Sequence, residues 1–161
     1  MKIQAKSLDS LFLILQQYGH SFSNDFWTMT FRGVLRPLFD EIHFTFHMRS
    51  RELDHIKKSC ENAFNYLIKL FSSFFDNLCG LFNEIIEIIL NCIQNTHEAL
   101  AKISITSFGA VIMRNASKLK KEHWELILDT FEKIFKLNTP RQLMDHKVLE
   151  SDISANEHTV L

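Results

Sequence analysis

The stretch YGHSFSNDFW, residues 18–27, contains the side-chain types of a hydrolytic site within ten positions. His20 and Asp25 could act as a general base and its orienting carboxylate beside a nucleophilic serine. The surrounding sequence offers no loop of oxyanion donors, so we interpret the stretch as a corner between two helices. Gly19 then ends the first helix near the C′ position, where a left-handed conformation is easily reached. Ser23 caps the second helix, and Asp25 lies in its first turn, where the helix dipole favours negative charge.

A cluster of histidines is the second candidate for chemistry. His43 and His47 lie four residues apart, and Glu41 and His55 are nearby, so the group contains ligand types that zinc accepts. Residues 40–54 break the helical pattern and are predicted to form a loop, where a spacing of four does not place two side chains on one face. We therefore favour solvated loop histidines and predict no metal site.

Two groups of charged residues are the remaining candidates for a reactive site. The run Lys118, Lys120 and Lys121 is interpreted as the solvated start of a helix rather than a phosphate-binding patch. Glu84 and Glu87 are interpreted as a strip facing solvent rather than an acid/base pair. The sequence also has no glycine-rich loop that would cradle a phosphate. We therefore predict no catalytic, cofactor-binding or metal-binding residues, no cofactor and no enzymatic activity.

The composition favours long helices packed by aromatic side chains. The chain has 161 residues, which suggests one domain, and 46% of them are apolar, which is enough for a sizeable core. Fifteen phenylalanines with only four glycines and two prolines argue against a turn-rich β fold. The net charge of −1 provides no field that would attract nucleic acid or an acidic membrane.

The three cysteines and the most apolar stretch give information on the protein's environment. Cys60, Cys79 and Cys92 are odd in number and widely spaced, so we predict buried free thiols in a reducing compartment rather than disulfides. The first ten residues contain no apolar core of a signal peptide. Charged residues interrupt the apolar stretch from Tyr66 to Leu90, which makes a membrane-spanning helix an unfavourable interpretation.

Hydrophobic periodicity predicts six helical segments. The first covers about residues 8–18, and the second begins after Ser23 and is kinked or ended by Pro37. Asn95 is predicted to cap the fifth helix in a capping box. After the loop at 40–54, apolar stripes mark the four remaining helices within residues 60–78, 82–93, 100–112 and 124–135.

The second and sixth helices carry a similar pattern at an offset of 97 residues. Both begin with a tryptophan and continue with bulky apolar residues, and each follows a short linker after the end of a preceding helix. The matching pairs are Trp27 and Trp124, Phe31 and Leu128, Val34 and Phe131, and Leu38 and Phe135. The offset equals about two helix-pair units of the HEAT or armadillo size.

We predict an all-α domain over residues 1–140, followed by a polar tail over residues 141–161 that we expect to be flexible. In the domain, three antiparallel helix hairpins stack as an armadillo- or HEAT-like α-solenoid. The third and fourth helices are apolar over most of their circumference and should be the most buried. The first and last helices should expose apolar surface at the ends of the stack, for which useful probes are Leu11, Phe12, Ile127 and Phe131.

Two groups of corner and core residues occur in a recognisable order. In the first, a helix ending in Tyr18, Gly19 and His20 precedes a helix that carries Trp27 and runs into Leu38, Phe39 and Asp40. The second contains, in order, Cys92, Gln94, Glu98, Leu100, Ala101, Asn115, Trp124, Thr139 and Pro140. Over about residues 7–143 this order resembles the C-terminal helical repeats of the large Golgi Arf guanine-nucleotide exchange factors, the brefeldin-A-inhibited (BIG) group and its fungal counterpart.

The chain departs from that family in two respects. The corner at Asn115 continues with Ala116, where the family has glycine after asparagine. The catalytic exchange domain of the family, with its glutamate finger, is absent from this sequence. The chain therefore resembles a fragment of the region named "homology downstream of the catalytic domain" (HDS), or a truncated paralogue.

The resemblance implies a non-catalytic regulatory scaffold in Golgi vesicle-mediated transport. It implies a cytoplasmic location, peripheral on Golgi and trans-Golgi membranes, and partners among proteins rather than nucleic acids. These partners would include activated Arf-family small GTPases and other segments of the same exchange factor. No binding residue is carried over from the family, because the matched positions are structural.

An alternative is a free-standing HEAT-like adaptor, related to these proteins in fold only or to their exchange-inactive (Mon-two-like) relatives. A small helical enzyme is the third alternative. An exchange domain upstream in the same reading frame would favour the regulatory segment, whereas a true start at Met1 would favour the adaptor.

Overall fold

A computed structural model of the chain describes residues 5–48 and 54–138, and every regular element in these two ranges is helical. The prediction of an all-α chain with six helices is confirmed for them. In chain order, the six helical rods are α1 (Ala5–Tyr18) with the 3-10 turn η1 (Gly19–Ser21); α2 (Asn24–Thr30) with the π-helix η2 (Phe31–Leu35) and α3 (Arg36–Met48); α4 (Asp54–Ser73) with α5 (Phe75–Leu78) and the 3-10 turn η3 (Cys79–Leu81); α6 (Phe82–Ile93); α7 (Glu98–Asn115); and α8 (Lys121–Asn138).

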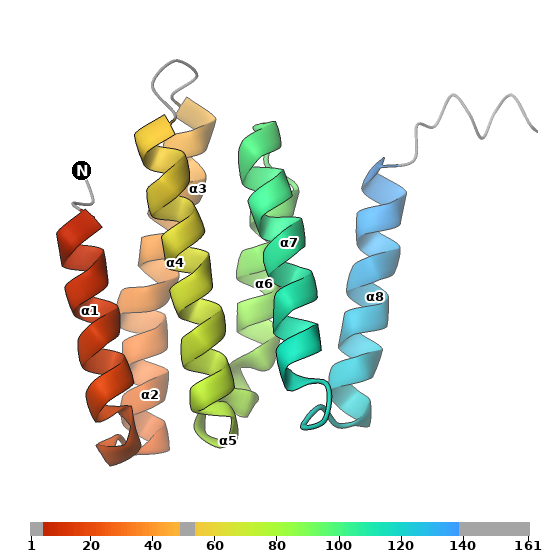
Figure 1. Cartoon of the computed structure of the whole chain (residues 1–161). Helices are drawn as coiled ribbons and strands as arrows, with labels where there is room; N and C mark the ends of the chain where they lie inside the picture. The colour runs from red at the N-terminus through yellow and green to blue at the C-terminus, as the bar shows by residue number, and fades with distance from the viewer. Residues whose placement is uncertain (1–4, 49–53, 139–161) are drawn as a thin grey trace, which may run out of the picture.

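The rods stand side by side with their axes roughly aligned (Figure 1). The helix α4 packs against α1 on one side and α7 on the other, and α6 packs against α3, α7 and α8. One hydrophobic cluster runs through all six rods, from Leu8 in α1 to Ile127 in α8. The predicted tail at 141–161 and the predicted domain boundary at residue 140 lie outside the described residues.

The second rod differs most from the prediction. Residues 24–48 form one continuous helical rod, so the helix does not end at Pro37, and the predicted loop over residues 40–48 is wrong. Pro37 follows the π-helix directly, where the widened turn already interrupts the regular hydrogen-bond series, so its missing N–H is tolerated. Phe39, Ile42 and Phe46 are buried at helical spacing and extend the core face through the supposed loop.

The π-helix also moves the core face of the second rod by one residue. The predicted stripe of this rod contains Trp27, Phe31, Val34, Leu35 and Leu38. In the structure Trp27, Phe31 and Leu35 are buried as predicted, whereas Val34 is exposed, Leu38 is only half-buried, and Phe39 is buried in its place. A π turn accommodates one residue more than an α turn, so every apolar position after it is displaced by one.

The third and fourth rods are the most buried, as predicted. In α6, seven of twelve residues are buried, namely Phe82, Ile85, Ile86, Ile88, Ile89, Cys92 and Ile93. Aromatic rings connect the two rods, because Phe71 of α4 stacks on Phe82 with ring centroids 5.6 Å apart. A helix that is apolar over most of its circumference requires neighbours on several sides, and α6 has them in α3, α7 and α8.

The turn before α7 is built differently from the predicted capping box. His97, not Asn95, is the N-cap, and its Nδ1 accepts a hydrogen bond from the N–H of Ala99 at 3.3 Å. Asn95 is buried two residues earlier, where its Oδ1 accepts from the N–H of His97 at 2.9 Å. Its Nδ2 donates to the carbonyl of His43 at 3.3 Å. Asn95 therefore holds the turn against α3 instead of capping α7.

Asn115 organises the turn between α7 and α8. This residue is buried, and its Nδ2 donates to the Val111 carbonyl at 2.8 Å and to Ser72 Oγ at 3.2 Å. Its backbone carbonyl accepts from the N–H groups of Lys118 and Leu119. Within the described residues, Asn115 Oδ1 has no hydrogen-bond partner. One amide thus ties the start of α8 to the end of α4.

Candidate functional site

The corner at residues 18–27 has a structural role. Ser23 is the N-cap of α2, as predicted, and its Oγ accepts a hydrogen bond from the N–H of Phe26 at 3.2 Å. Asp25 lies in the first turn of α2, also as predicted. The His20 side chain is exposed, with its ring centroid 6.3 Å from that of Phe74. The serine hydroxyl therefore stabilises the helix start and is not aligned by a base for nucleophilic attack.

Gly19 is required at this corner for close packing. The Trp27 indole Nε1 donates to the Gly19 carbonyl at 3.2 Å, and Trp27 is fully buried. A Cβ on Gly19 would lie 2.6 Å from Trp27 Cζ2 and 2.6 Å from Phe74 Cζ. The predicted left-handed conformation is wrong, because no glycine of the described residues has a positive φ. Two aromatic rings, rather than the backbone dihedral, exclude a side chain here.

The candidate histidine cluster is only partly contained in the described residues. Glu41 and His43 belong to α3 and not to a loop, so the assumption behind their interpretation is wrong. The side chains of His47 and His55 lie outside the described residues. Among the residues that the structure describes, no three His, Cys, Asp or Glu side chains come close enough to hold a metal ion.

The cysteine prediction is confirmed for two of three residues. All three cysteines are free, Cys60 and Cys92 are buried, and Cys79 is half-buried. Burial raises the pKa of the Cys92 thiol to about 12 and raises the pKa of Cys60 well above its ordinary value. The two buried thiols therefore remain protonated at neutral pH and are poor nucleophiles.

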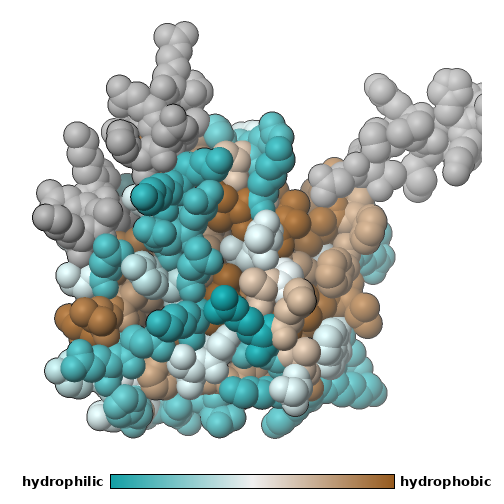
Figure 2. Space-filling model, viewed as in Figure 1, coloured by the Kyte–Doolittle hydropathy of each residue, from teal (hydrophilic) through white to brown (hydrophobic). Residues whose placement is uncertain are grey.

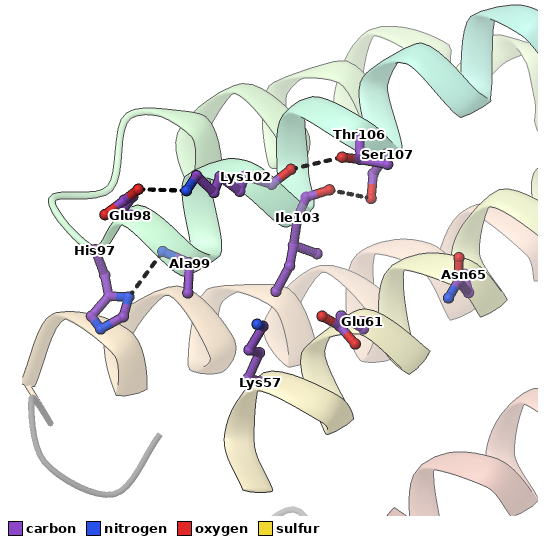
Figure 3. A pocket seen from close by; sticks show the side chains of 10 residues that line it. All are labelled: Lys57, Glu61, Asn65, His97, Glu98, Ala99, Lys102, Ile103, Thr106 and Ser107. Carbon is purple, nitrogen blue, oxygen red and sulfur yellow. Dashed lines mark hydrogen bonds and ion pairs between the residues drawn. The ribbon is translucent and has the colours of Figure 1, made fainter. Parts of the chain in front are cut away.

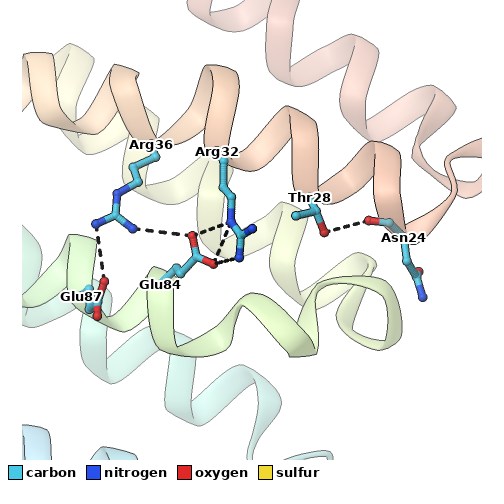
Figure 4. Close-up of polar contacts among 6 residues, drawn as sticks. All are labelled: Asn24, Thr28, Arg32, Arg36, Glu84 and Glu87. Carbon is cyan, nitrogen blue, oxygen red and sulfur yellow. Dashed lines mark hydrogen bonds and ion pairs between the residues drawn. The ribbon is translucent and has the colours of Figure 1, made fainter.

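Glu84 joins two rods instead of lying in a solvent strip. Arg32 holds its carboxylate with two nitrogens, Nε at 3.1 Å and Nη2 at 2.6 Å from Oε1 (Figure 4). Arg36 lies 3.5 Å from Glu84 and also 3.5 Å from Glu87. The hydrogen bond from Arg32 and the charges of both arginines hold the pKa of Glu84 below its ordinary value. The interpretation as a solvent strip is therefore wrong for Glu84, whose side chain is only 18% exposed.

An open groove of about 590 Å³ lies between α4 and α7 (Figure 3). Its charged residues are of both signs, and Lys102 pairs with Glu98 at 2.5 Å on the exposed rim. The hydroxyls of Thr106 and Ser107 donate to carbonyls one turn earlier in α7, at 3.0 and 2.7 Å. The polar groups of the groove are thus largely bound to the chain itself, and their arrangement offers no activated nucleophile or base.

The lysine run marks the start of α8, as predicted. Lys118 Nζ donates to the Ser72 carbonyl at 3.3 Å and lies 5.5 Å from the centroid of the Phe75 ring. Lys121 forms an ion pair with Glu125 one turn later, at 3.6 Å. These contacts use the lysines locally, so the run does not present three free cations to a phosphate.

The helix α8 carries several large apolar side chains that are exposed on one face. Trp124, Leu128 and Phe131 are 39%, 65% and 41% exposed, and Phe135 continues the spacing and is 69% exposed. We name Trp124, Leu128 and Phe131 the α8 stripe. Apolar surface gathers on the α7–α8 side of the molecule in Figure 2. Ile127 and Thr130 of α8 are buried, whereas the α8 stripe is exposed, which agrees with the prediction that this helix exposes apolar surface at Phe131.

Of the four residues named as probes of exposed apolar surface at the ends of the stack, one is exposed. Phe12 and Ile127 are buried and Leu11 is half-buried, whereas Phe131 is exposed. In α1 the exposed apolar residues are Leu13 and Ile14. The apolar periodicity of α8 already contained the signal for its stripe, but the sequence did not reveal which half of the apolar face is covered.

Comparisons with known proteins reveal distant relatives. The chain is 26% identical over 155 residues to the ADP-ribosylation factor guanine nucleotide-exchange factor SEC7 of Saccharomyces cerevisiae, covering 93% of this chain and 8% of that protein. It is 23% identical over 156 residues to the brefeldin A-inhibited guanine nucleotide-exchange protein 2 of Arabidopsis thaliana, covering 86% and 9%. The corresponding protein 1 of Homo sapiens is 23% identical over 145 residues, covering 89% and 8%.

No protein-family profile and no solved structure matches the chain. No helix among the described residues is long and apolar enough to cross a membrane. The chain spans less than a tenth of the length of the three relatives named above. It is therefore a distant homologue of a short segment of the large Arf guanine nucleotide-exchange factors.

Proposed function

We propose that this chain is a non-catalytic regulatory and scaffold segment that acts in Golgi vesicle-mediated transport through protein binding and membrane recruitment. The observation that carries the proposal is the alignment of 93% of the chain with only 8% of an Arf exchange factor. A relationship confined to so short a segment favours an accessory role over the exchange reaction that names the whole protein. The helical fold, with aromatic corners and no assembled reactive centre among the described residues, supports the same role.

We place the segment in the C-terminal helical region of these exchange factors. The residues that carry the resemblance support this placement through their structural roles. Gly19 and Trp27 form the first corner, and Asn115 forms the last one. Such positions constrain packing and not chemistry, so they identify a building unit of a helical scaffold. We further propose that the three helix pairs belong to an armadillo- or HEAT-like stack, in which each pair rests on its neighbours.

Function in this proposal comes from surfaces and not from a reaction centre. Aligned helices provide rigid faces, and the Glu84 ion pairs fix the second rod against α6. Proposed partners are activated Arf-family GTPases and other segments of an exchange factor. Recruitment to the cytoplasmic face of Golgi membranes would follow from these contacts.

The proposal is tested with the purified chain and an Arf GTPase loaded with a fluorescent guanine nucleotide. We expect no acceleration of nucleotide release at any concentration of the chain, and we expect the GTP-bound GTPase to be retained on the immobilised chain more strongly than the GDP-bound form. Exchange that depends on the chain would contradict the non-catalytic role. Equal or absent retention of both forms would contradict the proposed GTPase partner.

The alternative is a helical adaptor without any link to nucleotide exchange. Fluorescence microscopy of the tagged chain in cells distinguishes the two functions. Golgi localisation that is lost when Arf activation is blocked supports the regulatory segment, and a distribution independent of Arf activation supports the adaptor.

A further inference from the structure

The helix α8 has a wide apolar face, of which only half is packed. Ile127 and Thr130 are buried, and His123 and Leu126 beside them are half-buried. The ring of His123 contacts that of Phe82 in α6, with centroids 5.0 Å apart. The α8 stripe lies on the adjoining half of the same face and is exposed, although the Phe131 ring also contacts that of Phe108 in α7, with centroids 5.1 Å apart.

The spacing within this exposed half is that of a helix–helix seam. From Trp124 the apolar positions follow at intervals of four, three and four residues, to Leu128, Phe131 and Phe135. Intervals of three and four residues keep these side chains on one face of a helix, where a second helix can pack along them. Eleven residues at 1.5 Å each extend over ~16 Å, so a partner helix of about three turns would cover the seam.

The second rod of the same chain shows what covers such a face. At the offset of 97 residues, Trp27 and Phe31 correspond to Trp124 and Leu128, and both are fully buried. The cover comes from the next helices of the chain, where the Phe74 ring lies 5.0 Å from the Trp27 ring and α5 packs on α2. Within this chain, the equivalent tryptophan is thus covered by a helical segment that carries phenylalanines.

The faces of α2 and α8 that lie opposite the two tryptophans also differ in burial. Phe26 and Met29 of α2 are exposed, whereas their equivalents in α8, His123 and Leu126, are half-buried against the preceding rods. The burial of the two helices is therefore reversed over their first two turns, whereas Val34 and its equivalent Phe131 are exposed in both.

The charges of α8 favour a protein helix over an anionic membrane. Its acidic residues slightly outnumber its lysines, and three pairs are satisfied within the helix: Lys121 with Glu125, Asp129 with Lys133, and Glu132 with Lys136. Binding to an anionic membrane surface requires a cluster of cations that is not neutralised by acids. The α8 stripe is therefore an apolar seam with a balanced border, which suits another amphipathic helix.

We propose that the α8 stripe is a docking face for an amphipathic helix of another helical-repeat segment, one that presents Phe, Leu or Ile at intervals of three and four residues. This inference rests on the proposed binding role and deepens it, because it names the face and the chemistry of the partner. The helix lies along α8 and buries Trp124, Leu128 and Phe131, as Phe74 and α5 cover Trp27.

The two tryptophans allow a direct test on the full chain. A proton–nitrogen correlation spectrum of the ¹⁵N-labelled chain contains one indole N–H signal from Trp27 and one from Trp124. The probe is a synthetic peptide of residues 54–78, the helix that covers Trp27 within the chain. We expect the Trp124 signal to shift and saturate with added peptide, while the Trp27 signal, whose N–H is bound to Gly19, stays in place.

Two variants of exposed residues make the test specific. Leu128→Lys adds a cation to the α8 stripe beside Glu125 and Glu132, so the helix should remain stable and the peptide affinity should fall at least tenfold. Met113→Lys changes an apolar residue on α7 that is even more exposed than Leu128 and should leave the affinity unchanged. Equal affinities of both variants would contradict the assigned face.

Other results would overturn the proposal. One is the absence of a Trp124 shift at ~1 mM peptide, the concentration at which even a binding energy of only about 4 kcal/mol becomes visible. Joint shifts of both signals would indicate exchange with α4 instead of docking on α8. A shift that follows chain concentration without peptide would assign the face to a second copy, and one seen only with phosphatidylserine vesicles would assign it to a membrane. None of these measurements contains a GTPase, so their failure is separate from that of the proposed function.

Discussion

Substituting Gly19 by alanine tests whether packing or backbone conformation requires glycine at the first corner. The new Cβ would meet Trp27 Cζ2 and Phe74 Cζ at 2.6 Å each, well inside ordinary contact distance. Phe74 is half-buried and can yield, but Trp27 is fully buried and its indole N–H is bound to the Gly19 carbonyl. The indole must therefore move, and the hydrogen bond must lengthen.

The expected cost follows from these two effects. Forcing an additional methyl group into a packed core costs about 1–3 kcal/mol. Weakening a buried hydrogen bond adds about 0.5–1.5 kcal/mol if it is lost entirely. We therefore expect Gly19→Ala to lower the free energy of unfolding by about 2–3 kcal/mol. For a chain of this size that corresponds to a decrease in Tm of roughly 4–12 °C.

The assay is urea unfolding followed by circular dichroism, with Gly109→Ala as the matched control. Gly109 lies within α7 with no atom within 4 Å of an added Cβ, so alanine there should stabilise the chain by up to ~1 kcal/mol. Phe74→Leu in the Gly19→Ala background should recover part of the loss, because one of the two clashing rings is removed. A loss below ~0.5 kcal/mol, or no coupling between positions 19 and 74, would refute the packing explanation.

Three further predictions concern other parts of the molecule. Trp27→Ala should cost about 3–5 kcal/mol in urea unfolding, whereas His20→Ala, at an exposed position, should cost little; equal losses would contradict the assigned core. The pKa of Glu84 is lowered in the folded state, so its stabilisation is present above the ordinary carboxyl pKa and is lost as the pH falls through the lower folded pKa; a Glu84→Gln variant should show a shallower acid-unfolding curve, and an unchanged curve would contradict the ion pair. A thiol reagent at neutral pH should modify Cys79 first and the two buried cysteines only after unfolding, which mass spectrometry can count; equal rates for all three would contradict their burial.

Much of the architecture could be predicted because it depends on local periodicity. Helical spacing of apolar residues identified the six helices, and the apolar circumference of α6 identified it as a central element. The cap at Ser23 depends on residues within one turn, so it was also accessible from the sequence. These features need no knowledge of distant contacts.

Predictions failed where a distant neighbour decides the result. Pro37 would ordinarily end a helix, but the π turn before it and the burial of Phe39 favour continuation. Glu84 resembled a solvent-facing residue because its partners, Arg32 and Arg36, are about fifty positions away in the sequence. The sequence could not supply this pairing, since it depends on how the second rod lies against α6.

Trp27 and Trp124 differ in burial although the sequence around them follows the same pattern. From the sequence alone the two residues are equivalent, because each leads a helix with the same apolar spacing. Periodicity specifies that a helix has an apolar face, but burial depends on whether another element covers that face. Trp27 is covered by Phe74 and α5, while Trp124 remains exposed on α8, and this difference arises from how the rods pack and not from the local spacing.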